Sequence, residues 1–310
     1  MQVGFIGLGH MGQHMARHVA EAGHDVAAYD LRPEAISELV QTPRARRATS
    51  VAQAASEAEV VFTSLPGPPE VESVAAGPDG LLESMRPGAV YVDLSSNSPS
   101  TVRRLCAAFA ERGIAMLDAP VAGGVEGARA GTLSVMVGGD RAAFDRVRPV
   151  LDAIGTRVFY CGVSGNGAIT KLCNNLCSQA QIAAAGEILT LGVKAGVDLQ
   201  TLASVIGVST GSCRAIVETF PKQLFRRHFE NPGFTTFLSA KDTHLAIELA
   251  HELGVPMPIG EIVERDKQES LRRGWGPLSP DVFVRLQEER AGVVLELAPE
   301  AVASGASMSG

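Results

Sequence analysis

A glycine-rich turn near the amino terminus constrains the fold of this chain more than any other feature. The stretch VGFIGLGHMGQHMARHVAEAGHDVAAYD holds Gly7, Gly9 and Gly12 in the spacing GxGxxG. A short apolar run precedes these glycines, an amphipathic helical pattern follows them, and Asp30 ends the next strand-like run. Strand, glycine turn, helix, strand and acid in this order are typical of a dinucleotide-binding βαβ unit.

The glycines of the turn have separate physical roles. Gly7 allows the tight turn, Gly9 lets the backbone approach a pyrophosphate, and Gly12 lets helix and strand pack closely. The following helix start offers amide groups and a partial positive charge. The predicted cofactor-binding residues of the turn are Gly7, Leu8, Gly9, His10, Met11 and Gly12.

Asp30 indicates which dinucleotide binds. A carboxylate at this position accepts hydrogen bonds from the adenosine ribose and repels a 2′-phosphate, so we predict NAD. Arg32, two residues later, keeps NADP as the alternative, because a guanidinium can pair with that phosphate. The basic run at 44–47 is interpreted as a solvated loop rather than a second phosphate site.

Strand-like and helical patterns alternate through the first half of the chain. Apolar runs predict strands at 2–6, 25–30, 59–66, 89–95, 114–121 and 133–139, with helical patterns at 33–40, 70–74 and 101–112. The last helix follows a capping signal, Ser98-Pro99-Ser100. The alternation predicts an α/β doubly wound domain of the Rossmann type, with a mainly parallel sheet.

From residue 164 the strand signal almost disappears. A helical run from Gly167 to Ala195 is followed by helical patterns near 199–206, 212–228, 235–253, 258–273 and 280–291. We therefore predict a dinucleotide-binding domain at 1–163 and an all-α substrate and dimerisation domain at 164–297, joined by a long interdomain helix with its hinge near 161–165. The small, polar tail at 298–310 is expected to be disordered.

Composition excludes several classes of function. The net charge of −7 does not favour binding to nucleic acid or to an anionic membrane, and no apolar run has the length of a membrane span. The opening MQVGFIGLG enters a strand-like run directly, so we expect no signal peptide. Five cysteines, an odd number without a CxxC pair, indicate reduced thiols and a cytoplasmic protein.

The long helix carries polar side chains on one face. In GNGAITKLCNNLC, residues 165–177, Lys171, Asn174 and Asn175 share a face of a helix whose other positions are mostly apolar or small. Asparagine is a poor helix former, so its presence twice needs a reason. A solvated face is the alternative, but the apolar surroundings favour a face that lines a cleft between the two domains.

Four further motifs follow the glycine turn in a fixed order. They are DLSSNSPSTVRRL (93–105), DAPVAGGVEGARAGTLSVMVGG (118–139), GNGAITKLCNNL (165–176) and KDTHLA (241–246). With the turn, they make the chain resemble the β-hydroxyacid dehydrogenases, the family of 3-hydroxyisobutyrate dehydrogenase and tartronate semialdehyde reductase, as far as about residue 292. The resemblance implies hydride transfer between NAD(P) and a 3-hydroxy acid, and an all-α domain like that of 6-phosphogluconate dehydrogenase.

The resemblance also implies roles for single residues. Lys171 is similar to the catalytic lysine of the family and Asn175 to its partner. The positions implied for the cofactor, beyond the glycine turn and Asp30, are Leu65, Pro66, Ser96 and Lys241. Those implied for the substrate are Ala122, Gly123, Gly124 and Asn174.

Ala122 departs from the family pattern. The family usually has serine or threonine before the two glycines, as in PVSGG, whereas this chain has PVAGG. Loss of a hydroxyl that donates to a substrate carboxylate would cost roughly 1.5–3 kcal/mol. Either the amides of Gly123 and Gly124 suffice, or the substrate is not a simple small hydroxy acid.

The lysine suits the proton transfer that accompanies hydride transfer. Protonated Lys171 can give a proton to a carbonyl oxygen that is being reduced, and neutral Lys171 can take one from an alcohol. The alternatives are an imine reductase, which shares the two-domain build but typically lacks this lysine, and a non-catalytic dinucleotide-binding scaffold. The expected partners are a small-molecule substrate and, through the all-α half, further copies in a homodimer or homotetramer.

Histidines at helical spacing do not indicate a metal site. His10, His14 and His18 lie four residues apart beside polar neighbours, which is typical of a solvated face. His244 and His251 share a face with Glu248 but lack HExxH spacing and a third strong ligand. We therefore predict no bound metal.

Overall fold

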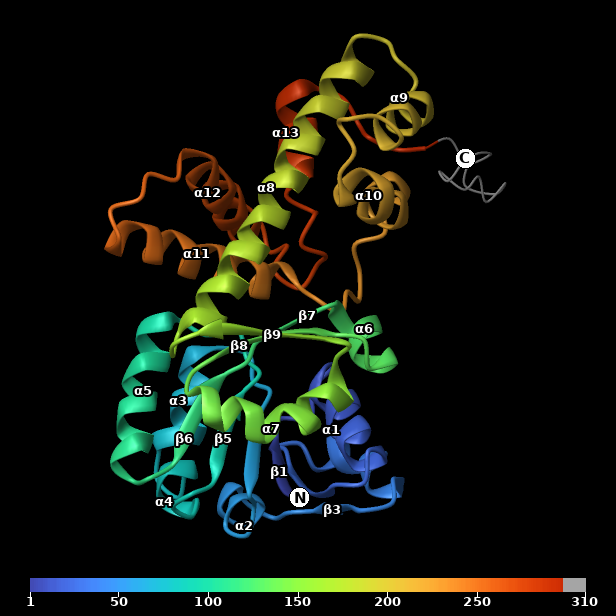
Figure 1. Cartoon of the computed structure of the whole chain (residues 1–310). Coiled ribbons are helices and arrows are strands. Elements are labelled where there is room, and N and C mark those ends of the chain that lie inside the picture. The colour runs from blue at the N-terminus through green and yellow to red at the C-terminus, as the bar shows by residue number, and fades with distance from the viewer. Residues whose placement is uncertain (298–310) are drawn as a thin grey trace. The chain divides into compact units, whose positions relative to one another are not determined.

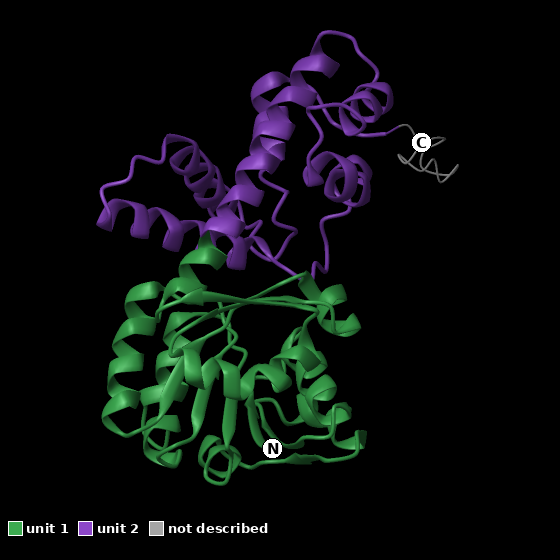
Figure 2. Cartoon of the chain, in the orientation of Figure 1, with its two compact units in different colours: residues 1–172 green, residues 173–310 purple. Residues whose placement is uncertain are grey.

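The computed structural model describes residues 1–297, so the expectation for the tail at 298–310 falls outside the described residues. The chain divides into two compact units, one of Met1–Leu172 and one that begins at Cys173 (Figure 2). Helix α8, Asn166–Lys194, begins in the first unit and continues into the second. The boundary predicted at 163/164 falls just before this helix and stays a prediction.

The first unit contains a single large sheet. Within the described residues, its nine strands follow the order β3-β2-β1-β4-β5-β6-β8-β7, and β9 pairs with β8 (Figure 1). They are β1 Gln2–Ile6, β2 Asp25–Tyr29, β3 Ala45–Arg47, β4 Val60–Thr63, β5 Val90–Asp93, β6 Ala115–Asp118, β7 Val121–Ala122, β8 Ser134–Gly138 and β9 Arg157–Gly162. The run from β3 to β6 is parallel throughout and has the Rossmann order, which confirms the predicted fold class.

Helices cover both faces of this sheet. They are α1 Gly12–Glu21, α2 Val51–Ala55, α3 Pro68–Ala76, α4 Leu81–Ser84, α5 Pro99–Glu111, α6 Gly124–Ala130 and α7 Arg141–Ile154. Successive strand residues point to opposite faces. Phe5 and Phe62 therefore join a core with residues of α1 and α7, while Val61 and Tyr91 join a second core with residues of α5. Burial on both faces explains the continuous apolar runs of these strands.

Several local expectations for the first unit are wrong. The basic run at 44–47 is not a loop, because Ala45–Arg47 pairs with β2 as an edge strand, where arginines remain exposed. No strand is predicted at β9, although its sequence RVFYCG contains a run of four apolar residues. The segment 33–40 forms 3-10 turns at Pro33–Ile36 and Leu39–Gln41 instead of one helix. Strand β8 runs antiparallel to β6 and β7, which agrees with the prediction of a sheet that is mainly, and not wholly, parallel.

The second unit is all-α, as predicted: its described residues, 173–297, contain no strand. Beyond α8 it has α9 Leu199–Gly207, α10 Phe220–Lys222, α11 Thr236–Glu252, α12 Pro258–Arg272 and α13 Val284–Ala291, with shorter turns at Ala215–Thr219 and Leu224–Arg226. Its core packs Leu189 of α8 with aromatic side chains, among them Phe220, Phe225 and Phe283. The single helix expected at 212–228 is divided instead. A π-helical turn at Ala215–Thr219 leads into α10, which contains Pro221, and a 3-10 turn follows at Leu224–Arg226. No helix among residues 1–297 is long and apolar enough to cross a membrane.

Candidate active site

The glycine turn connects β1 to α1, beside the point where the strand order reverses between β1 and β4. Open α/β sheets bind ligands at this switch point. Gly7 has φ +91°, and a Cβ there would lie 2.3 Å from the Ser64 carbonyl oxygen. A Cβ on Gly12 would lie 2.0 Å from the Gly7 carbonyl oxygen. Both positions therefore require glycine for the fold itself.

Gly9 differs from the other two glycines. A Cβ on Gly9 would have no atom within 4 Å, and its φ is not in the left-handed region. The chain around it therefore does not need glycine, and open space lies where a ligand would approach the backbone. Leu8 is buried, Met11 is half-buried and His10 is exposed beside this space. Helix α1 has no acidic residue in its first turn, so no carboxylate competes with a pyrophosphate there.

Asp30 and Arg32 contact each other directly after β2. Oδ2 of Asp30 accepts a hydrogen bond from the Leu8 amide at 2.7 Å, and Oδ1 accepts one from the Arg32 amide at 2.8 Å. The Arg32 Nε also lies 3.4 Å from Asp30 Oδ1. Asp30, which favours NAD, and Arg32, which favours NADP, thus form an ion pair. The Arg32 side chain is exposed, whereas that of Asp30 is mostly buried.

Leu65, Pro66 and Ser96 lie in the loops after β4 and β5, which a buried carboxylate holds. Asp93 accepts hydrogen bonds from Thr63 Oγ1, the Ser95 amide and Asn97 Nδ2 at 2.9–3.1 Å. Ser95 Oγ in turn accepts the Leu65 amide at 2.9 Å. Burial raises the pKa of Asp93 above its ordinary value. Sequence reasoning missed Asp93, because its partner Thr63 at the end of β4 lies thirty residues away in the sequence.

The predicted substrate turn lies between β7 and α6. Gly123 and Gly124 have φ of +135° and +64°, so both adopt backbone conformations that favour glycine. Ala122 ends β7 and is half-buried, while the two glycines are exposed. Their exposed backbone amides remain candidates for holding a carboxylate.

Lys171 lies in the second turn of α8, and Asn174 and Asn175 lie one turn further on. Lys171 and Asn175 are half-buried, whereas Asn174 is exposed. Residues four apart on a helix lie on the same face, so Lys171 and Asn175 are neighbours. The structure thus keeps the polar face that the sequence indicates.

A polar network in the second unit orients Asn175. Its Nδ2 donates to Asp242 Oδ2 at 2.6 Å, and its Oδ1 accepts from Asn174 Nδ2 at 3.1 Å. Lys241 Nζ forms an ion pair with Asp242 Oδ1 at 2.9 Å. Asp242, at 1% exposure, therefore connects two predicted site residues. The sequence shows only that it follows Lys241, and not that it reaches α8.

The predicted residues accordingly fall into two sets. In the first unit, the glycine turn, Asp30, Leu65-Pro66 and Ser96 follow the carboxyl ends of β1, β2, β4 and β5, respectively. The same unit also contains the 122–124 turn and Lys171. The second unit carries Asn174, Asn175 and Lys241. The roles of all these residues stay predictions.

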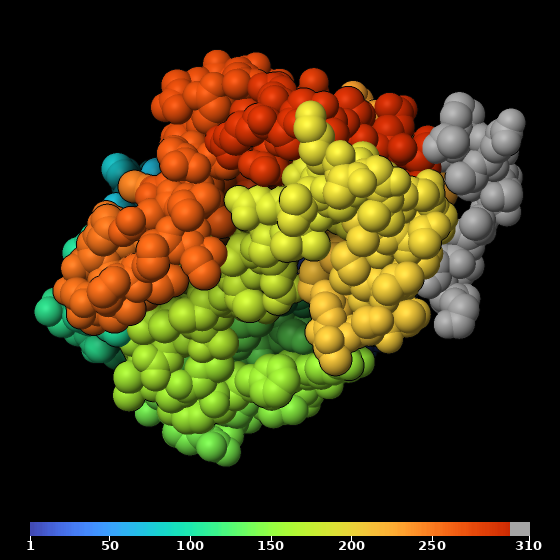
Figure 3. Space-filling model, turned by 90° about the horizontal axis from the view of Figure 1, so that it is seen from above, coloured from blue at the N-terminus to red at the C-terminus, as the bar shows by residue number. Residues whose placement is uncertain are grey.

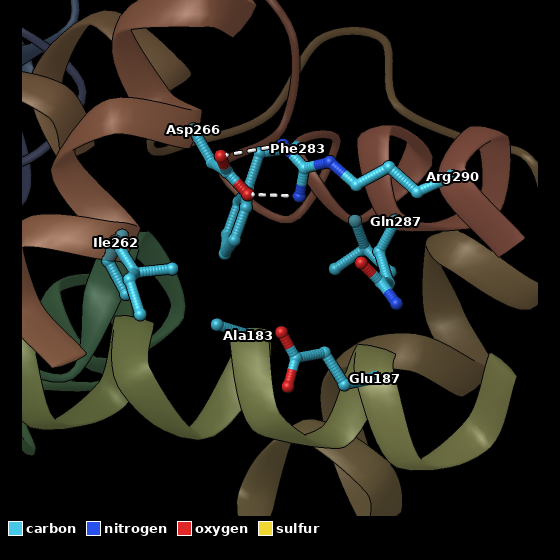
Figure 4. A pocket seen from close by; sticks show the side chains of 9 residues that line it. Ala183, Glu187, Ile262, Asp266, Phe283, Gln287 and Arg290 are labelled. Carbon is cyan, nitrogen blue, oxygen red and sulfur yellow. Dashed lines mark hydrogen bonds and ion pairs between the residues drawn. The ribbon is translucent and has the colours of Figure 1, made fainter. Parts of the chain in front are cut away.

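The remaining candidates give no ligand site. Residues 1–297 contain no group of three His, Cys, Asp or Glu side chains that could hold a metal ion. A cavity of about 10 Å³, the size of one water molecule, lies among α8, α12 and α13 (Figure 4). Two of its charged groups pair with each other, since Arg290 donates two hydrogen bonds to Asp266 at 2.7 and 2.8 Å.

Comparison with known families and proteins covers both units. Residues 2–162 match the family model of the NAD binding domain of 6-phosphogluconate dehydrogenase. Residues 165–277 match the model described as NAD-binding of NADP-dependent 3-hydroxyisobutyrate dehydrogenase.

Individual relatives are similar over most of the chain. The 2-(hydroxymethyl)glutarate dehydrogenase of Eubacterium barkeri is 36% identical over 94% of this chain and 97% of its own length. The 3-hydroxyisobutyrate dehydrogenase of Pseudomonas aeruginosa is 39% identical over 84% and 89%. The solved structure of a 3-hydroxyisobutyrate dehydrogenase from Mycobacterium tuberculosis with L-serine has a TM-score of 0.84 and 32% identity, and covers 92% of this chain and 98% of that one. An imine reductase of Streptomyces aurantiacus, with a TM-score of 0.61 and 22% identity over 93% of this chain and 99% of that one, shares the fold.

Proposed function

Because the chain belongs to the β-hydroxyacid dehydrogenase family, we propose that it is an NAD(P)-dependent dehydrogenase that interconverts a 3-hydroxy acid, or a related alcohol, and its semialdehyde or ketone. The observation that carries the proposal is Lys171 in the second turn of α8, in the same compact unit as the glycine turn. A scaffold that only bound dinucleotide would need no such lysine. An imine reductase typically lacks it.

The turn between β1 and α1 fits a dinucleotide. Gly9 leaves open space and α1 presents its amides. Asp30 follows β2, where its carboxylate would accept hydrogen bonds from ribose hydroxyls. When bound, the nicotinamide supplies or accepts the hydride. We propose that Leu65, Pro66, Ser96 and Lys241 complete its binding site.

The proton transfer is assigned to Lys171. In the reducing direction its ammonium donates a proton to the substrate oxygen, and in the oxidising direction its neutral amine accepts the hydroxyl proton. Asn175, oriented by Asp242 and Asn174, would hold the reacting groups without changing its own charge. Gly123, Gly124 and Asn174 would bind the rest of the substrate.

An assay of the purified protein tests this function. NADH- and NADPH-linked reduction of semialdehydes, and oxidation of 3-hydroxyisobutyrate, 2-(hydroxymethyl)glutarate and L-serine, should reveal turnover of at least one substrate. Turnover of cyclic imines alone would identify an imine reductase. Cofactor binding without turnover of any compound would favour the scaffold.

The cofactor is predicted to be NAD(H). The Asp30 carboxylate lies where a 2′-phosphate would approach, and two negative charges at contact distance repel. We expect NADH to bind at least about 10-fold more tightly than NADPH, which is roughly 1.4 kcal/mol. Calorimetric titration measures both affinities. In Asp30→Ala the preference should disappear, because Arg32 loses its partner and can pair with the phosphate. Tighter binding of NADPH to the wild type would contradict the prediction.

Ala122 is predicted to set substrate specificity. Ala122→Ser restores a hydroxyl at the substrate turn and should raise kcat/KM for 3-hydroxyisobutyrate by about 10-fold or more, if one charge-assisted hydrogen bond is gained. Activity on larger or less polar substrates should fall. Ala130→Ser, the same change at the exposed end of α6, is the control and should alter neither. Equal kinetics for Ala122→Ser and the wild type would exclude a specificity role.

We also propose a homodimer or homotetramer formed through the second unit. The later half of α8 and the following helices lie on one surface of this unit (Figure 3). Ile188, Leu191 and Val205 on α8 and α9 are more than half exposed, which is unusual for large apolar side chains unless a partner covers them. A cytoplasmic location is proposed because all five cysteines are free.

A further inference from the structure

The side chain of Asp118 ties the end of β6 to the start of α8. Asp118 is 1% exposed, and its Oδ1 accepts a hydrogen bond from the Gly165 amide at 2.9 Å. Its Oδ2 accepts one from the Ala168 amide at 2.8 Å. The first amides of a helix have no partners within that helix. Asp118 therefore caps α8 from a strand more than forty residues away in sequence, and both partners lie in the first unit.

Helices α5 and α7 of this unit are capped by the side chains of their own N-cap residues. Ser98 Oγ accepts the Thr101 amide of α5, and Asp140 Oδ1 accepts the Ala143 amide of α7. At the start of α8, by contrast, Asn166 uses its side-chain amide to donate to the Cys161 carbonyl at 2.9 Å. The cap of α8 thus fixes the helix to the sheet, and not only to its own loop.

Two glycines allow this tie to be short. Gly138 of β8 pairs with Asp118, and a Cβ on Gly138 would lie 2.6 Å from Asp118 Oδ1 and 2.8 Å from the Gly167 amide nitrogen. A Cβ on Gly167 would lie 2.3 Å from the Met136 carbonyl oxygen and 2.6 Å from that of Asp118. The first turn of α8 therefore lies against the backbones of β6 and β8 without an intervening side chain.

We propose that Asp118 is a positioning residue for proton transfer: it holds the first turn of α8 so that Lys171, one turn later, keeps a fixed place relative to the glycine turn. This inference rests on the proposed role of Lys171. A misplacement of about 1 Å can cost roughly 100-fold in rate. The effect should appear in kcat and not in cofactor affinity, because the glycine turn belongs to β1 and α1.

The tie should respond to pH. The pKa of Asp118 is raised to about 6, mainly by burial, with a smaller contribution from Asp93 at the end of β5, and against the two amide hydrogen bonds, which lower it. From α5, Cys106 faces the same region, but burial raises the pKa of its thiol to about 11, so it stays neutral. Arg103 of α5 also lies at this junction, with its Nε 3.1 Å from the position that a Cβ on Gly165 would take. A protonated Asp118 accepts more weakly, so one amide loses its acceptor as the pH falls through 6.

This activity loss is distinguishable from unfolding. A carboxyl whose pKa is raised in the fold binds its proton more tightly in the folded chain than in the unfolded chain. Its contribution to stability is therefore present at low pH and is lost as the pH rises through about 6. Acid thus weakens the tie at α8 while it favours the folded state through this group.

The experiment compares Asp118→Asn with Asp140→Asn, the same change at the cap of α7. The rate of semialdehyde reduction is measured from pH 5 to 8, together with NADH affinity by calorimetry. The wild type and Asp140→Asn should lose rate below about pH 6. Asp118→Asn should have a kcat about 10- to 100-fold lower and wild-type NADH affinity. Its rate should show no further loss below pH 6. A loss of rate below about pH 6 that is caused by any other group would persist in Asp118→Asn and overturn the assignment.

Hydrogen exchange of the segment 163–172 provides a readout independent of activity. The exchange rate of this segment should be higher in Asp118→Asn than in the wild type. In the wild type, the rate corrected for intrinsic exchange should rise when the pH is lowered from 7.5 to 5. The wild-type measurement needs no variant and so stands even if Asp118→Asn fails to fold. Faster exchange with unchanged kcat and pH profile would make the tie structural only and overturn the proposal. Failure of the proposed function would look different, since the wild type and both variants would then lack turnover.

Discussion

Replacing Lys171 by alanine is expected to lower kcat about 10²- to 10⁴-fold, the usual contribution of a positioned acid or base. The fold and the affinity for NADH should remain, because the proposed role of this side chain is at the reacting oxygen and not at the glycine turn. Steady-state kinetics with the best substrate of the panel, and calorimetry with NADH, measure the two effects. Lys194→Ala, the same change in the last turn of α8, is the matched control and should retain wild-type kcat.

Further variants separate proton transfer from positioning. Lys171→Arg should recover little activity, because a guanidinium does not release its proton near neutral pH. Asn175→Ala should cost less than Lys171→Ala, because an amide orients groups without transferring a proton. The pH profile of alcohol oxidation should contain a group that must lose its proton, and this limb should vanish in Lys171→Ala. If Lys171→Ala turns over a true substrate at a near wild-type rate, the polar face of α8 is structural.

The features that sequence analysis predicts correctly depend on local constraints. The glycine turn can be recognised from the sequence because backbone atoms close to Gly7 and Gly12 leave no room for a side chain at either position. The alternation of apolar strands with helices follows from burial of the sheet on both faces, which shows directly in the runs at 59–66 and 89–95. The Ser98 cap is likewise local, because its partner lies three residues on. Rossmann order and the all-α second unit follow from such signals.

The features that sequence analysis misses depend on contacts between distant residues. Asp93 connects loops about thirty residues apart, Asp118 reaches amides about fifty residues away, and Asp242 reaches Asn175 across 67 residues. No sequence spacing indicates which residues these three aspartates contact. In the sequence they therefore look like any other polar residue. Strand β9 is a different case, because its sequence RVFYCG does contain a short apolar run, and its pairing with β8 shows that this run is a strand.

Gly9 offers a test of the cofactor site that leaves the fold intact. A methyl group on Gly9 would meet no atom of the chain within 4 Å, so Gly9→Ala should fold with wild-type stability or slightly more, since alanine restricts the unfolded chain. The same methyl group would occupy the space through which a pyrophosphate approaches the backbone. Loss of one charge-assisted hydrogen bond, about 1.5–3 kcal/mol, corresponds to roughly 10- to 150-fold weaker NADH binding.

Gly12→Ala is the control in which the same methyl group acts on the fold instead. Its Cβ would lie 2.0 Å from the Gly7 carbonyl oxygen, so the helix must move away from β1 and the melting temperature should fall. Thermal unfolding and NADH calorimetry on both variants separate the two effects. Weak binding with a normal melting temperature in Gly9→Ala would place the pyrophosphate on this turn, because no internal contact explains it. Wild-type NADH affinity in Gly9→Ala would instead mean that the cofactor does not approach the turn at Gly9, and would contradict the proposed binding of the pyrophosphate at the glycine turn.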